Sequence, residues 1–316
     1  MRVPSREALL SELDSLGHGA RTARVATLGR DAREDPALAR LLAELMQGEA
    51  YEACLALELA RGAGDEAVLL RGLTHASCLV RGKAAAFAGS FIRDDAALER
   101  VLPELSPSMR RRVLKGVALA RRGPLATRLL PTVLTRHGAE EAACLLPALE
   151  SDEVRRLLPE LGHMVHGWRT LAHRHPDAVL AFLQSTLADA PERERPRRFF
   201  LYHQALAELS LLRSEAVLAL VRDFSPPDAL PAFVDAALPH LTRRHPEQVF
   251  ALLTRPAFRA TLLSQGLPRG LLRQARAFSP PQRLALARSL AEAPHHLAGL
   301  LEALTPYERP ALFAHA

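Results

Sequence analysis

Helix starts recur along this chain with one chemical signature: a polar residue, then proline, then apolar residues at helical spacing. The pairs are Asp35-Pro36, Ser106-Pro107, His175-Pro176, Ser225-Pro226, His245-Pro246, Ser279-Pro280 and Thr305-Pro306. A Ser, Thr or Asp side chain accepts hydrogen bonds from backbone N–H groups of the first turn, and proline lacks an N–H that would have no partner there. The pattern predicts roughly twenty helices of about ten to sixteen residues with short connections.

The residue types available for a core also favour helices. Hydrophobic residues make up 48% of the chain but aromatic residues only 5%, so the core must consist of Leu, Ala and Val. Ala, Leu and Arg are strong helix formers, and no run of alternating β-branched residues is present. The sequence predicts an all-α fold with no sheet.

Internal similarity predicts a repeat. The segment 171–183 aligns with 241–253, an offset of seventy residues. Two repeats of about thirty-five residues would give that offset, a length typical of helical-repeat units. We therefore expect residues 1–316 to form a single continuous helical-repeat domain.

Leu-Pro pairs within apolar stretches have two possible meanings. In a helix interior such a proline kinks the axis, whereas in a first turn it is tolerated. The pairs are Leu102-Pro103, Leu130-Pro131, Leu146-Pro147, Leu158-Pro159, Leu230-Pro231 and Leu238-Pro239.

The segment 79–88, Leu-Val-Arg-Gly-Lys-Ala-Ala-Ala-Phe-Ala, resembles the second-helix core of a HEAT repeat. In that family a Val-Arg pair precedes small residues at close-packed positions. The resemblance implies a right-handed α-solenoid of roughly ten helical hairpins, HEAT- or armadillo-like, with a concave surface for partners. Many unrelated functions share this fold, so it does not by itself define one.

Positive charge is concentrated in two acid-free stretches. Residues 105–139 contain eight basic residues and 248–291 contain seven, while the whole chain has a net charge of +6. Arg111, Lys115 and Arg122 are separated by four and seven residues, and Arg269, Arg273 and Arg276 by four and three, so each set is expected on one helix flank. The candidate surface for an anionic partner comprises Arg110, Arg111, Arg112, Lys115, Arg122, Arg269, Arg273 and Arg276.

Three interpretations of this basic surface remain open. Lys83 and Lys115 are the only lysines against thirty-nine arginines, so arginine is a compositional default and the stretches are first of all solvated faces. The alternatives are a binding surface for an acidic protein and a phosphate-binding surface for nucleic acid. Nucleic-acid surfaces usually add stacking aromatic residues, which residues 110–115 lack.

Catalytic and metal-binding patterns are weak. His163, His166, His173 and His175 are clustered, but no Cys, Asp or Glu stands between them at a ligand position. His295-His296 is interpreted as a helix start. Glycine-rich phosphate loops, nucleophile elbows and zinc-finger spacings are absent from the sequence. We predict no catalytic, metal or cofactor-binding residue.

Two enzyme groups resemble HEAT solenoids. The deoxyhypusine hydroxylases bind iron through His-Glu pairs, and this sequence has no His-Glu dipeptide. The alkylpurine DNA glycosylases combine a basic concave surface with a carboxylate and aromatic residues. The sole Trp, Trp168, has Asp152, Glu153 and Asp177 as its nearest acids, so glycosylase-like activity is kept as an alternative, although a lone Trp is typically a core or interface anchor.

The remaining features favour a cytoplasmic protein that binds other macromolecules. The N-terminal segment has no apolar stretch of signal-peptide length, no window is long and apolar enough to span a membrane, and Cys54, Cys78 and Cys144 resemble buried reduced thiols. We expect a non-enzymatic protein-interaction or scaffold module, with a protein or peptide as partner and nucleic acid as the alternative. The segment 310–316 lacks a polar capping helix, from which we expect truncation, a further domain in the native chain, or self-association.

Overall fold

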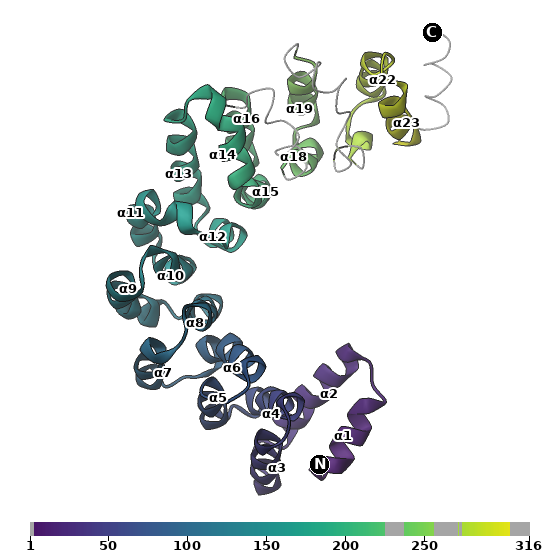
Figure 1. Cartoon of the computed structure of the whole chain (residues 1–316). Helices are drawn as coiled ribbons and strands as arrows, with labels where there is room; N and C mark the ends of the chain where they lie inside the picture. Colours follow the sequence, from purple (N-terminus) through teal and green to yellow (C-terminus); the bar gives the residue numbers. More distant parts are fainter. Residues whose placement is uncertain (1–2, 225–236, 256–270, 272–273, 304–316) are drawn as a thin grey trace. The chain divides into compact units, whose positions relative to one another are not determined.

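The computed structural model of this chain describes residues 3–224, 237–255, 271 and 274–303, and within them every regular element is a helix (Figure 1). The all-α prediction is confirmed for this part of the chain. Its contacts divide into two compact units, one of residues 1–150 with 161–165 and the other of residues 151–160 with 166–316. Each unit is described separately, and the single continuous domain stays a prediction.

The first unit contains ten α-helices. They are α1 (Arg6–Asp14), α2 (His18–Asp31), α3 (Pro36–Gln47), α4 (Ala50–Ala63), α5 (Glu66–Leu73), α6 (Cys78–Phe91), α7 (Asp95–Val101), α8 (Pro107–Leu119), α9 (Gly123–His137) and α10 (Ala139–Ala142), with 3-10 turns η1 (Leu102–Glu104) and η2 (Ala143–Ala148). Helices α4, α6 and α8 pack side by side in chain order, and α8 packs on η2. In Figure 1, α5, α7 and α9 form a second row beside them.

The second unit repeats one local arrangement. In its described residues the α-helices are α11 (Ser151–Leu161), α12 (Trp168–Arg174), α13 (Pro176–Ala188), α14 (Arg195–Leu201), α15 (His203–Leu212), α16 (Ser214–Phe224), α18 (Leu238–Arg244), α19 (Pro246–Leu253), α22 (Pro280–Ser289) and α23 (Pro294–Ala303), with 3-10 turns η4 (Glu192–Glu194) and η6 (Ala275–Ala277). The 3-10 turn η3 (Gly162–Met164) belongs to the first unit. A single residue joins α12 to α13, α15 to α16 and α18 to α19, and α15 packs against both α12 and α18.

The two segments that align in the sequence are the pairs α12–α13 and α18–α19. Their junction residues, His175 and His245, have almost the same backbone angles, φ −129° and ψ 56° against φ −134° and ψ 55°. Arg213 joins α15 to α16 with φ −138° and ψ 50°. The offset of seventy residues therefore spans one intermediate pair of the same geometry.

The predicted proline starts are confirmed wherever the structure describes them. Pro36, Pro107, Pro176, Pro246 and Pro280 each occupy the first turn of a helix. Ser225-Pro226 and Thr305-Pro306 lie outside the described residues, as does the segment 310–316. Both interpretations of the Leu-Pro pairs occur, because Pro131 and Pro159 lie inside helices whereas Pro239 lies in a first turn.

Leucine, alanine and valine form the core, as the composition predicts, and bring helix backbones close together. Glycines mark the closest approaches. A methyl group added to Gly89 of α6 would overlap the carbonyl oxygen of Val113, and one added to Gly116 of α8 would lie 3.0 Å from the Gly89 Cα. In the same way, a methyl group on Gly62 of α4 would lie 2.8 Å from the Ala26 carbonyl oxygen of α2. These helices touch backbone to backbone.

Junction residues in the second unit reach back to the first turn of an earlier helix. The His175 Nδ1 atom is 3.0 Å from the Ser151 hydroxyl oxygen at the start of α11. Two further junctions repeat this arrangement: Arg213 donates to both carboxylate oxygens of Asp177 at 2.8 and 3.1 Å, and the His245 Nε2 atom is 2.9 Å from the Ser214 hydroxyl oxygen. Each contact fixes one helix pair against its predecessor.

Replacing Gly89 with alanine is expected to lower the free energy of unfolding by about 1 to 3 kcal/mol, because the new methyl group must push α6 away from the α8 backbone. Gly19→Ala is the matched control, since Gly19 lies in α2 with no atom within 4 Å of an added methyl group. The control should stabilise the chain by about 0.5 to 1 kcal/mol through helix propensity. Urea unfolding followed by circular dichroism measures both, and an unchanged Gly89→Ala midpoint would contradict the close approach.

Candidate functional site

The basic residues predicted as one helix flank lie on two separate elements. Arg111 and Lys115 belong to α8, which ends at Leu119, whereas Arg122 is the N-cap of α9. Between the helices, Arg121 has a left-handed φ of 57°. The expectation that one helix flank carries Arg111, Lys115 and Arg122 is therefore wrong, because α8 ends at Leu119, three residues before Arg122.

Arg110 and Arg111 bind the paired acids that open α10. Arg110 is almost fully buried and donates to both carboxylate oxygens of Glu141, at 2.7 and 3.1 Å. Arg111 forms an ion pair with Glu140. Both acids lie in the first turn of α10 and neutralise the start of the basic stretch.

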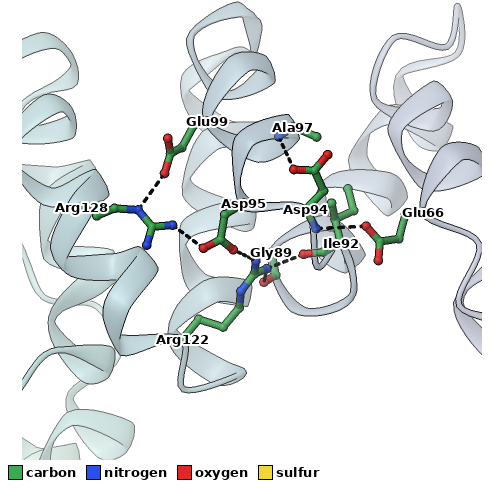
Figure 2. A network of polar contacts seen from close by, with 9 residues as sticks. All are labelled: Glu66, Gly89, Ile92, Asp94, Asp95, Ala97, Glu99, Arg122 and Arg128. Atoms are coloured by element: carbon green, nitrogen blue, oxygen red, sulfur yellow. Dashed lines mark hydrogen bonds and ion pairs between the residues drawn. The ribbon is translucent and has the colours of Figure 1, made fainter.

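Arg122, the N-cap of α9, connects the start of that helix with α6 and α7 (Figure 2). Its guanidinium donates to the backbone carbonyls of Gly89 at 2.9 Å and Ile92 at 2.6 Å, at the end of α6. It also binds the carboxylate of Asp95 in the first turn of α7. The cation predicted to face a partner thus holds the α6–α7 junction.

Asp95 is shared between two arginines. Arg128 of α9 binds its second carboxylate oxygen and also donates to Glu99 at 3.2 Å. Burial raises the pKa of Asp95, but the hydrogen bonds from Arg128 and Arg122 outweigh that effect and hold the pKa below its ordinary value. Next to it, the Asp94 backbone N–H donates to Glu66 of α5 at 3.1 Å, so the network continues to a fourth helix (Figure 2).

The other predicted cations differ in how far the structure describes them. Arg112 is exposed and donates to the Gly82 carbonyl at 3.0 Å. Lys115 is exposed and has no carboxylate partner in the described part of the chain. Arg276 is exposed in η6, whereas Arg269 and Arg273 lie outside the described residues. The predicted second basic row therefore stays a prediction.

Cations and aromatic rings meet between α4 and α6. The Arg61 guanidinium carbon lies 4.9 Å from the Phe87 ring centre and 5.7 Å from that of Phe91. Lys83 lies 5.9 Å from the Phe87 centre, a distance at which a cation is attracted to the ring. Glu58 of α4 binds both cations at 2.9 Å. Sequence reasoning missed this cluster, because its members are up to thirty-three residues apart.

Large apolar side chains are exposed on α4, α6 and α8. Leu79 of α6 is 69% exposed and Leu119 of α8 is 63% exposed, with Phe91 and Tyr51 at 40% and 46%. We call the surface formed by the outward side chains of these three helices the α4–α6–α8 face. It comprises Tyr51, Glu58, Arg61, Leu79, Lys83, Phe87, Phe91, Arg111, Arg112, Lys115 and Leu119.

Two histidines of the predicted cluster, His173 and His175, have structural partners within the second unit. His173 Nδ1 is 2.9 Å from Glu208 of α15, which also accepts a hydrogen bond from Arg169 at 3.1 Å. Burial raises the pKa of Glu208, but these hydrogen bonds leave it below its ordinary value. Glu208 is a site residue that sequence reasoning missed; its only signal is a carboxylate within the apolar run of α15. Among the described residues no group of three metal-binding side chains occurs.

Trp168 is a core residue, as expected of a lone Trp. It is buried, stacks on Phe182 with ring centres 5.6 Å apart and meets Tyr202 edge-on at 5.0 Å. His295 and His296 lie in the first turn of α23, which confirms the predicted helix start. Because the Trp168 ring is packed inside the protein, it is not exposed to contact a nucleic-acid base as the aromatic residues of the glycosylases do.

The three thiols are free and differ in exposure. Cys144 is buried and Cys54 half-buried, and burial raises the pKa of both. Cys78 is exposed, so the prediction of a buried thiol is wrong at this position. As the first residue of α6 it lies at the helix end, outside the packed stripe.

Comparison with protein-family models, with curated proteins and with solved structures finds no match to this chain. No helix among the described residues has the length and hydrophobicity needed to cross a membrane.

Asp95→Asn is expected to lower the free energy of unfolding at pH 7 by about 1 kcal/mol, since the carboxylate is partly exposed and solvent screens its ion pairs. The folded-state pKa of Asp95 lies below its unfolded value, so its contribution is present above that value and is lost as the pH falls through the folded pKa. The difference between wild type and variant should therefore shrink between about pH 5 and pH 2.

Asp152→Asn is the control, because Asp152 is 94% exposed and, among the residues that the structure describes, pairs with Arg155 alone at 3.3 Å. Chemical unfolding at several pH values measures both variants. If Asp152→Asn lowers the free energy of unfolding as much as Asp95→Asn does, the network in Figure 2 contributes no more to stability than a single exposed ion pair.

Proposed function

We propose that this chain is a non-enzymatic protein-interaction module that binds a protein or peptide on the α4–α6–α8 face. The fold that we propose for the chain is a HEAT-like α-solenoid of roughly ten helical hairpins. The side-by-side packing of α4, α6 and α8 in one unit and of α12, α15 and α18 in the other supports such a repeat.

The exposed apolar side chains of the face carry this proposal. Leu79 and Leu119 are each more than 60% exposed on neighbouring helices. A single exposed leucine needs no explanation, whereas several large exposed apolar side chains on neighbouring helices, with cations between them, favour an interaction surface. Helix α6 packs on α8, with Leu79 in the first turn of α6 and Leu119 at the end of α8.

The state of the arginines argues for a protein partner over nucleic acid. Arg110, Arg111, Arg122 and Arg128, half of the basic residues in the first acid-free stretch, are bound to carboxylates. They are therefore poorly placed to replace counterions on a phosphate backbone. Trp168 is buried, which also removes support from glycosylase-like activity.

Selection from a random peptide library displayed on phage tests the proposal. We expect enriched peptides whose binding to the full chain falls at least tenfold in the double variant Leu79→Ser/Leu119→Ser, because both changes remove exposed apolar contact area without opening the core. Fluorescence anisotropy with the synthetic peptides measures the change.

Leu134→Ser is the matched control, since Leu134 is an exposed leucine of α9, outside the face. It should leave peptide binding unchanged. Peptides that bind wild type and the double variant equally would overturn the proposal. So would an absence of selected peptides together with salt-sensitive binding of DNA or RNA at about 50 mM salt, which would favour the nucleic-acid alternative.

A further inference from the structure

Both lysines of the chain lie on the α4–α6–α8 face. Lys83 projects from α6 and Lys115 from α8, the two helices in closest contact, while the other thirty-nine basic residues are arginines distributed over the whole chain. A general preference for arginine in this sequence does not explain why the two lysines lie on the same face. The lysine ammonium is a compact, hydrated point charge, unlike the planar guanidinium group of arginine.

The face has an excess of positive charge. Its cations are Arg61, Lys83, Arg111, Arg112 and Lys115, and its carboxylates are Glu58 and the adjacent Glu140, which leaves three unbalanced positive charges. Glu58 alone serves Arg61 and Lys83, and Arg112 and Lys115 have no carboxylate partner in the described residues. The nearby acid Glu141 is buried and fully bound to Arg110.

Apolar and cationic side chains occupy different levels of the face. Arg112 meets Gly82, and Ser90 donates to the Gly116 carbonyl at 3.0 Å, so α6 and α8 run in the same direction. Tyr51 and Leu79 lie in the first turns of their helices, and Phe91 and Leu119 are the last residues of theirs. The two lysines lie between these apolar ends.

The distance between the two apolar ends of the face defines the length of a peptide that could contact both. Leu79 and Phe91 are separated by twelve residues of α6, or about 18 Å at the helical rise. An extended chain covers about 3.3 Å per residue, so about six residues reach from one apolar end to the other. Carboxylates between two apolar anchors would then meet the lysines.

We propose that the α4–α6–α8 face binds a short acidic protein segment with an apolar side chain at each end, whose carboxylates contact Lys83 and Lys115. This inference rests on the proposed function and specifies the chemistry of the partner. Electrostatic attraction sets selectivity for acidic segments, and the apolar ends supply contact area.

The lysines themselves serve as probes. Reductive methylation with ¹³C-formaldehyde keeps their charge and gives one dimethyl-lysine NMR signal for each of the two side chains, besides that of the N-terminus. The ligand is an octapeptide with leucine near each end and four glutamates between, and its counterpart has glutamine in place of glutamate. The acidic peptide should shift both lysine signals at about 50 mM salt and lose affinity as salt screens the charges.

Variants separate charge from packing. Lys115→Gln should weaken the acidic peptide about fivefold in fluorescence anisotropy, and Lys115→Arg should restore most of the affinity. Arg136→Gln removes an exposed charge from α9, outside the face, and should change nothing. Unchanged thermal unfolding shows that each variant is folded.

The outcomes distinguish the two proposals. Equal binding of both peptides, with Leu79→Ser/Leu119→Ser still disruptive, would overturn the acidic partner and leave the protein-interaction surface in place. Lysine signals that neither peptide shifts, while library peptides still bind elsewhere, would overturn both. Short single-stranded DNA that shifts the lysine signals at a lower concentration than the acidic peptide would identify the face as a phosphate surface and overturn the inference.

Discussion

Direct contact between helix backbones is the constraint on which the first unit depends. Gly89 and Gly116 let α6 and α8 approach until only a hydrogen fits between them, and Gly62 allows the same between α4 and α2. A core with so few aromatic residues has little bulk to fill wider gaps, so small residues at the crossings keep its packing dense. The α4–α6–α8 face exists because helices packed this closely present adjacent side chains on one surface.

Contacts between a junction and the first turn of an earlier helix form a second, polar constraint. In the first unit the Asp94 N–H meets Glu66 and Arg122 meets Asp95; in the second, His175 meets Ser151, Arg213 meets Asp177 and His245 meets Ser214. The residue types differ from pair to pair, but each contact joins a helix junction to the first turn of an earlier helix. The first turn of a helix has free N–H groups and favours acids and hydroxyls, which are therefore present to receive a donor from the next junction.

The sequence predicted local structure well and tertiary partners poorly. Helix starts were readable because a cap and a proline act within one turn, as at Asp35-Pro36. Arg110 and Arg122 were grouped with the exposed cations because their own neighbourhood has no acid, yet Glu141 and Asp95 reach them from thirty-one and twenty-seven residues away. The exposure of Leu79 could not be predicted from the sequence either, since an apolar residue in an apolar helix is expected to be buried. Only the packing of α6 leaves this side chain exposed.

The distinction between arginine and lysine changes how the basic stretch is interpreted. Guanidinium groups with five donors can bind a carboxylate and a backbone carbonyl together, as Arg122 does with Asp95, Gly89 and Ile92, so much of the arginine content stabilises the fold. Net charge in a sequence window therefore overstates the charge offered to a partner. For the partner proposed above, the small excess of positive charge on the α4–α6–α8 face would orient the ligand, and most of the affinity would come from the apolar side chains at the two ends of the face.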